Sequence, residues 1–164
     1  SEISLVTNQW GNSYKRISGG FEAPISATWS SGNRCTMLRV PRYMPNKSSS
    51  RRVEVRTPDP GCNPYLAFAA IFAAGLKGVE EGYEIPPEAE EDVNLMHPKE
   101  RKAMGYPDLP KSLASALACF ESSELMAEAL GEHVFEFLIR SKHEEWTRYS
   151  RHVTPFELRH YLSL

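Results

Sequence analysis

The chain has 164 residues, a formal net charge of −2, 41% hydrophobic residues and 24% charged residues. This length suits one domain and excludes two large ones, and the composition is too apolar for intrinsic disorder. The charge balance leaves no excess of cations for a phosphate backbone, so we expect no nucleic-acid partner.

The three cysteines, at positions 35, 62 and 119, match neither a disulfide framework nor a close-spaced zinc site. This pattern favours a reducing compartment. No stretch approaches the roughly 18 apolar residues that a membrane-spanning helix needs. We therefore expect a soluble, cytoplasmic protein with no membrane partner.

The first 62 residues are expected to form strands and active-site loops, and residues 63–164 to be mainly helical. Apolar and polar residues alternate in 23–30 and again in 34–40, the period of half-buried strands. The turn residues between these two segments predict that they form a hairpin. Residues 41–50 have no period and are expected to form a loop.

A third strand is expected over Arg51–Thr57, where valines alternate with ionic residues. Val53 and Val55 would face the core, and the opposite face would carry Arg52, Glu54 and Arg56. A carboxylate beside guanidinium groups stays ionised, because nearby positive charge lowers its pKa. It can then bind a metal ion while a neighbouring arginine holds a substrate carboxylate. The alternative is a ladder of solvated ion pairs with little energetic weight.

Further charged residues stand close upstream of this strand. Arg16, Arg34 and Arg39 lie at expected strand ends and loops, a density of guanidinium groups that favours a polyanionic ligand such as nucleotide phosphates. Glu22 lies between a double glycine and Pro24, which can place a carboxylate on a movable flap, as a general base or gate requires. A solvated loop glutamate is the alternative. The five histidines have no metal-ligand spacing that we recognise.

The helical half is expected to begin at Asn63, which can cap a helix, with Pro64 at the first helical position. The helix from Pro64 to about Glu80 is apolar nearly all round and is expected to be buried on most sides. Four more helices are expected: around 99–104, after a Ser112 cap, from about Glu124 to Tyr149, and from a capping box at 154–157. The predicted fold class is α+β, an antiparallel sheet segment followed by helices.

Six short runs resemble, in order and spacing, the C-terminal catalytic region of type-I glutamine synthetase, and the similarity continues to the end of the chain. These runs are Asn12-Ser13-Tyr14-Lys15-Arg16, Phe21-Glu22-Ala23-Pro24, Asn33-Arg34, Arg39-Val40-Pro41, Arg51-Arg52-Val53-Glu54-Val55-Arg56 and Asn63-Pro64-Tyr65-Leu66-Ala67-Phe68-Ala69-Ala70. The resemblance implies that residues 1–164 are the C-terminal part of a catalytic domain. It also implies an ATP-dependent ligase that phosphorylates the γ-carboxylate of L-glutamate, after which an amine displaces the phosphate.

The same resemblance implies roles for individual residues. Glu54 would be a ligand of Mg²⁺ or Mn²⁺, and Arg56 would hold the α-carboxylate of glutamate. Arg16 would contact glutamate or its phosphorylated intermediate. Glu22 would close over glutamate and take a proton from the incoming ammonium.

ATP phosphates would face Arg34 and Arg39, with Arg34 also near glutamate and placed to stabilise charge during transfer. The family commonly has a phosphate-binding lysine five residues before the metal-ligand glutamate. That position is Ser49 here, and Lys47 is the nearest lysine and the substitute candidate for ATP.

The acceptor amine stays open at this point. Ammonia is the first expectation, but the run at 42–50 looks like actinobacterial paralogues, some of which join glutamate to polyamines. Adenylylated members carry a tyrosine after Asn-Leu, whereas Met96 stands there in this chain, so that control is not expected. A catalytically inert structural chain is the second alternative, against which the retained arginines and glutamates argue.

The family's other metal-binding glutamates, its phosphate-side histidine and its N-terminal domain would all lie upstream of residue 1. The chain also lacks an initiator methionine. We therefore expect an excised C-terminal portion without synthetase activity of its own. The parent would assemble as a homododecamer of two stacked hexameric rings, with C-terminal helices reaching into the opposite ring.

Overall fold

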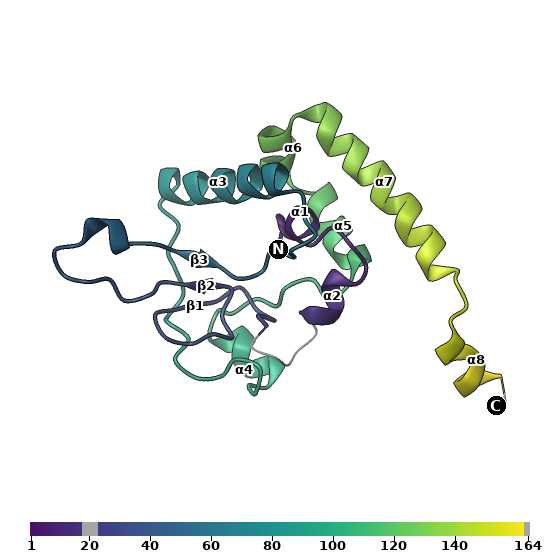
Figure 1. The fold of residues 1–164 in the computed structure, drawn as a ribbon, viewed down its shortest axis with the longest axis horizontal. Helices are drawn as coiled ribbons and strands as arrows, with labels where there is room; N and C mark the ends of the chain where they lie inside the picture. Colours follow the sequence, from purple (N-terminus) through teal and green to yellow (C-terminus); the bar gives the residue numbers. More distant parts are fainter. Residues whose placement is uncertain (18–22, 163–164) are drawn as a thin grey trace.

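The computed structural model describes residues 1–17 and 23–162, which form a small sheet beside a group of helices (Figure 1). The elements in chain order are α1 (Ser4–Thr7), α2 (Ser13–Arg16), β1 (Trp29–Ser30), β2 (Leu38–Arg39), the 3₁₀ turn η1 (Ser48–Ser50), β3 (Glu54–Val55), α3 (Pro64–Glu80), α4 (Pro98–Ala103), α5 (Leu113–Glu121), α6 (Glu124–Leu130), α7 (Glu132–Ser150) and α8 (Pro155–Tyr161). This architecture confirms the α+β class. None of the helices in these described ranges is long and apolar enough to cross a membrane.

The sheet has the strand order β1-β2-β3 and is mixed. The strands β2 and β3 are antiparallel, but β1 and β2 run parallel, so the predicted hairpin between residues 23–30 and 34–40 is wrong. The reason lies in the turn. Ser30 Oγ accepts hydrogen bonds from the backbone of Gly32 and Asn33, and Asn33 Oδ1 accepts one from Cys35 N. These local bonds curl the segment, and the chain re-enters the sheet in its original direction.

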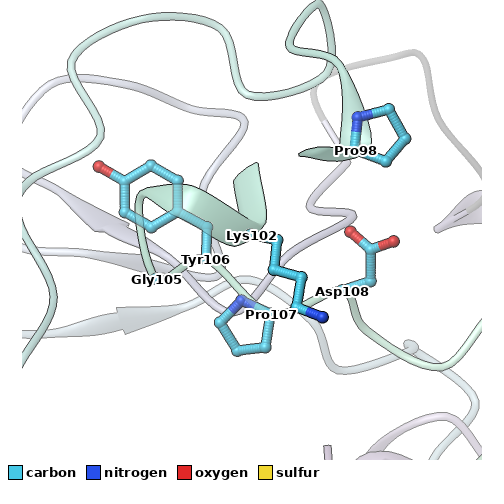
Figure 2. A pocket seen from close by; sticks show the side chains of 6 residues that line it. All are labelled: Pro98, Lys102, Gly105, Tyr106, Pro107 and Asp108. Atoms are coloured by element: carbon cyan, nitrogen blue, oxygen red, sulfur yellow. The ribbon is translucent and has the colours of Figure 1, made fainter. Parts of the chain in front are cut away.

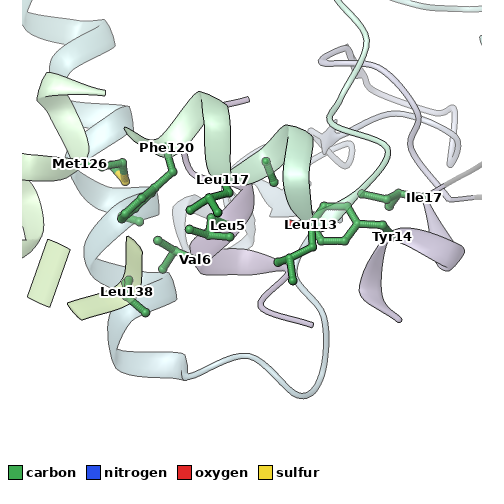
Figure 3. Close-up of a cluster of buried hydrophobic side chains, with 11 residues drawn as sticks. Leu5, Val6, Tyr14, Ile17, Leu113, Leu117, Phe120, Met126 and Leu138 are labelled. Atoms are coloured by element: carbon green, nitrogen blue, oxygen red, sulfur yellow. The ribbon is translucent and has the colours of Figure 1, made fainter. Parts of the chain in front are cut away.

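The third strand is shorter than predicted and does not bury a valine face. It spans only Glu54–Val55, and Val53 is 59% exposed. The apolar core lies instead among the helices, where side chains from α1, α2, α5, α6 and α7 pack together (Figure 3). Its largest members are Leu5, Val6, Tyr14, Ile17, Leu113, Leu117, Phe120, Met126 and Leu138.

The helix α3 has the predicted bounds and cap, since Asn63 Oδ1 accepts from the backbone N–H groups of Tyr65 and Leu66. Its predicted burial is wrong. Only Ala67 and Ala70 are buried, whereas Phe68 is 72% exposed. The short helices α1 and α6 contact one side of α3 and leave an apolar stripe uncovered, a type of surface that marks interaction sites. The stripe consists of Tyr65, Phe68, Phe72, Leu76 and Val79.

The single helix expected over 124–149 is two helices, α6 and α7, which are separated at Gly131. Gly131 has φ 73° and ψ 155°, a conformation that side chains strongly disfavour. The chain turns at this point. Helix α7 packs against α5 and α6, and its C-terminal end with α8 forms an arm that projects from the rest of the molecule (Figure 1). The capping box predicted at Thr154 and the cap predicted at Ser112 are confirmed.

We predict opposite effects from adding a methyl group at two glycines. Gly131→Ala should lower the free energy of unfolding by about 1–3 kcal/mol, because alanine disfavours this backbone conformation. Gly75→Ala, inside α3 where a Cβ would meet nothing within 4 Å, should raise it by up to about 1 kcal/mol. Urea unfolding followed by circular dichroism measures both. Wild-type stability in Gly131→Ala would show that glycine is not what permits this turn.

Candidate active site

The charged cluster predicted from the third strand forms at the antiparallel pair of β2 and β3. Arg39 lies directly opposite Glu54 in the strand register. Arg39 Nη1 donates to Glu54 Oε2 at 3.0 Å, and Arg56 Nη1 donates to Glu54 Oε1 at 2.6 Å. Both oxygens of one partly exposed carboxylate are thus held by guanidinium groups. The predicted neighbour Arg52 instead donates to Ser50 O and is exposed.

Two further predicted arginine positions meet at this cluster. Arg56 Nε donates to the backbone carbonyl of Arg34 at 2.9 Å. Arg16, the last residue of α2, donates from Nη2 to Arg56 O at 3.0 Å and from Nη1 to Thr57 O at 3.3 Å. The structure therefore brings together α2, the loop before β2, and the two strands, as the sequence interpretation requires.

The arginines change the acidity of the carboxyl group between them. The hydrogen bond from Arg56 is the largest influence on Glu54, and partial desolvation acts against it. The hydrogen bond from Arg39 and the charges of both arginines add to the first effect, and together they hold the pKa of Glu54 below its ordinary value. The predicted ionised carboxylate is confirmed in this sense, and an ionised oxygen pair is what a hard divalent cation prefers.

One further observation, on Arg39, shows that this cluster could bind the anionic oxygens of a phosphate. Arg39 Nε is buried and has no hydrogen-bond partner among the described residues. A buried donor without a partner is unfavourable, and an anionic oxygen would satisfy it. For a metal, the described residues contain no group of three or more His, Cys, Asp or Glu side chains that could hold an ion. Within these ranges Glu54 thus fits as a single carboxylate ligand, the number that Mg²⁺ with phosphates commonly takes.

One predicted site residue, Lys47, is not joined to the cluster, and another, Glu22, is not among the described residues. Lys47 immediately precedes η1, near the tip of the loop between β2 and β3, and this loop extends away from the sheet (Figure 1). The structure therefore does not bring Lys47 to Glu54. Glu22 lies outside the described residues, so its expected position over the site stays a prediction.

One residue that supports the site was missed in the sequence. Glu88 Oε1 accepts from Ser30 Oγ at 3.0 Å, from Ser31 N at 2.6 Å and from Ser31 Oγ at 2.7 Å. These bonds lower the pKa of Glu88 and hold the turn that leads to Arg34. Glu88 belongs to an acidic segment more than fifty residues away in sequence, so no local pattern signals this contact.

A hollow of about 630 Å³ lies elsewhere, beside α4, and contains none of the predicted site residues (Figure 2). It is lined by Pro98, Lys102, Gly105, Tyr106, Pro107 and Asp108. Its acidic group is already engaged, because Asp108 accepts from Arg101 and Lys111. The phenol of Tyr106 donates to backbone carbonyls of Pro87 and Glu88. We therefore place the candidate active site at Glu54 and not in this hollow.

The chain matches a known protein family over nearly its whole length. The family model described as the glutamine synthetase catalytic domain matches residues 1–161. The chain belongs to the glutamine synthetase family. Its resemblance to that family in sequence is thereby confirmed over almost the whole chain.

The relatives within the glutamine synthetase family are much longer than this chain. Proteins named glutamine synthetase from Mycobacterium tuberculosis and Mycolicibacterium smegmatis are 62% and 59% identical to it. These matches cover 99% and 100% of the chain, but only 36% and 37% of the relatives. The chain thus spans about a third of the length of the relatives it matches.

Solved structures match the fold closely. The structure titled "GmaS/ADP complex-Conformation 1" has a TM-score of 0.83 and 30% identity, and covers 99% of this chain and 36% of its own. The structure titled "Apo GmaS without ligand" has a TM-score of 0.81 and 31% identity, covering 99% and 35%. The arrangement of β2, β3 and the helices therefore occurs within a larger glutamine synthetase-like fold.

We predict an unequal effect of the two arginines on Glu54. Arg56→Gln should raise the pKa of Glu54 towards its ordinary value by more than Arg39→Gln, because the bond from Arg56 is the shorter and stronger one. Carboxyl-carbon NMR of the labelled protein during an acid titration measures both. Lys77→Gln, which removes a cation from the distant ion pair with Glu81, should leave the Glu54 midpoint unchanged. A larger change in the Glu54 pKa in Arg39→Gln than in Arg56→Gln would contradict the stronger influence assigned to Arg56.

Proposed function

We propose that the protein containing this chain is an ATP-dependent ligase that forms glutamine from L-glutamate and ammonia. The observation that carries this proposal is the Glu54 carboxylate held between Arg39 and Arg56. In the reaction, the γ-carboxylate of glutamate takes the γ-phosphoryl group of ATP and releases ADP. Ammonia then attacks the carbonyl carbon of γ-glutamyl phosphate, and phosphate leaves.

The proposed roles follow from what each side chain contacts. Arg56 binds the α-carboxylate of glutamate through its planar guanidinium group, which its bonds to Glu54 and Arg34 O orient. Arg39 faces the ATP phosphates, a role that its unpartnered buried Nε supports. Glu54 would supply one carboxylate ligand to Mg²⁺ or Mn²⁺, and the ion would offset the charge of the phosphates.

The remaining roles rest on family resemblance together with position. Arg34 lies beside Arg56 through its backbone, where its charge can stabilise the transferred phosphoryl group. Arg16 contacts the carbonyls of Arg56 and Thr57, so it lies beside the proposed glutamate position. Glu22 is proposed to close over glutamate and accept a proton from ammonium. Lys47 is the least supported ATP contact, because its loop extends away from the site.

Ammonia is proposed over a polyamine or another amine because of the similarity found. Over 99% of its length the chain is 62% identical to a Mycobacterium tuberculosis protein named glutamine synthetase. The arm of α7 and α8 also supports an assembled parent, proposed as two stacked hexameric rings. Phe156 and Tyr161 on this arm are 54% and 59% exposed and can bury their rings against another subunit.

The activity can be tested directly on the full-length gene product that contains this chain. We expect release of phosphate from ATP and formation of glutamine when L-glutamate, ammonium and Mg²⁺ are supplied. The 164-residue chain alone should release none. Parallel assays with methylamine, putrescine, spermine and ethanolamine identify the acceptor. If one of these amines forms an amide faster than ammonium does, that amine replaces ammonia as the proposed acceptor. If phosphate release does not depend on glutamate, the proposal is overturned.

The metal role of Glu54 is tested by Glu54→Gln in the same protein. We expect activity to fall by about 100-fold or more, the scale for losing a group that stabilises charge at an active site. The Mg²⁺ or Mn²⁺ concentration for half-maximal activity should rise. Glu81→Gln makes the same chemical change in the Lys77–Glu81 pair on α3 and should leave activity within about twofold. An unchanged metal requirement in Glu54→Gln would remove Glu54 from the ligands.

A further inference from the structure

Trp10 is joined through its backbone to the helix that carries Arg16. Trp10 N donates to Ser13 Oγ at 3.2 Å, and Ser13 N donates to Trp10 O at 2.9 Å. These two bonds close the turn that leads into α2, and Arg16 is the last residue of that helix. A displacement of Trp10 would therefore be transmitted to Arg16 within one helical turn.

The side chain of Trp10 is joined to a second segment. Trp10 Nε1 donates to the carbonyl of Gly61 at 3.0 Å. Gly61 lies in the loop that leads away from β3 and Arg56. A Cβ at position 61 would lie 3.3 Å from Trp10 Nε1 and 3.1 Å from Asp59 Oδ1, so the glycine permits this close approach. The indole thus links α2 to the loop that follows Arg56.

A third element, α7, contacts the indole ring of Trp10, a residue that is 47% exposed. Lys142 Nζ lies 4.2 Å from the centroid of the Trp10 ring, and it also donates to Glu145 Oε2 at 2.7 Å. Lys142 is only 5% exposed. A buried ammonium group is unfavourable unless it is compensated, and here a carboxylate and the face of an aromatic ring compensate it. An apolar residue would fill this place without that cost, but it would not attract the ring face.

Two of the three contacts lie on the segments that lead to the two arginines proposed to bind glutamate. Arg16, at the end of α2, donates to Arg56 O and Thr57 O. The segment that follows Trp10 is therefore bonded to the start of the segment that leads to Gly61. We propose that Trp10 is a positioning residue that sets the placement of Arg16 relative to Arg56, and that Lys142 holds its indole for this purpose. This inference rests on the proposed function, because it assigns both arginines to the same substrate.

The test uses Trp10→Phe in the full-length gene product, which removes the N–H donor and keeps a ring beneath Lys142. We expect the KM for glutamate to rise about threefold to tenfold, the loss that one neutral hydrogen bond explains. The kcat and the KM for ATP should stay within about twofold, since lost ground-state binding raises KM alone. Lys142→Met should act in the same direction, and Lys142→Arg, which keeps a cation over the ring, should restore the wild-type KM.

Trp29→Phe is the matched control. It also removes an indole N–H bond to a backbone carbonyl, that of Pro86 at 2.8 Å, but at a place with no described contact to Arg16 or Arg56. It should lower thermal stability and leave the KM for glutamate unchanged. A merely structural role for Trp10 would give the same result in Trp10→Phe, and that result would overturn the proposal.

A second measurement does not depend on turnover. Hydrogen exchange of the peptide covering 56–62, where the amides of Asp59, Gly61 and Cys62 are all bonded, should become faster in Trp10→Phe and not in Trp29→Phe. Unchanged exchange overturns the link between Trp10 and this loop, whether or not the wild type uses glutamate. A wild type without glutamate turnover overturns the proposed function instead. If Trp10→Phe does not fold, Lys142→Met carries the same two measurements with Trp10 in place.

Discussion

The site depends on one carboxylate placed between two guanidinium groups. Arg39 and Arg56 carry like charges, and Glu54 between them compensates the repulsion that their approach would cause. All three side chains are partly exposed, and ion pairs of this kind add little to stability. A contribution to folding therefore does not explain why the chain concentrates these charges on a two-residue strand. The proposed ligand binding would explain it, because a paired and ionised cluster is suited to a metal, a phosphate and a carboxylate.

The sheet alone cannot keep this cluster in register. Each strand has two residues, and a sheet of this size is not independently stable. Hydrogen bonds from outside the strands also hold the cluster in place. Arg16 donates to the carbonyls of Arg56 and Thr57, and Asp59 N donates to Thr7 O of α1. Since α1 belongs to the buried helical cluster, the packed helices support the polar site through a few backbone contacts. The position of the candidate site at β2 and β3 therefore depends on the packing of the helical core.

The parts of the structure that the sequence predicts are those determined locally. Asn63 with Pro64, Ser112 and Thr154 mark three helix starts, because a cap and its helix lie within four residues of each other. The period of two likewise places Glu54 and Arg56 on one face. The parallel pairing of β1 with β2 was not predictable in this way, because the turn before Arg34 is held by Glu88, which is distant in sequence. The exposure of α3 was missed for a similar reason: an apolar composition shows what a helix could bury, and not how much partner surface the chain provides.

The two arginines at Glu54 are not equivalent, and the difference agrees with their separate proposed roles. A metal ion that takes an oxygen of Glu54 would compete with one of them. Arg56 has the shorter bond to the carboxylate, and its Nε is also anchored on the carbonyl of Arg34. Arg39 has the longer bond, and its Nε has no partner among the described residues. Arg39 is therefore the side chain that is more easily released towards phosphate, while Arg56 stays fixed, as a residue that orients the α-carboxylate of glutamate must.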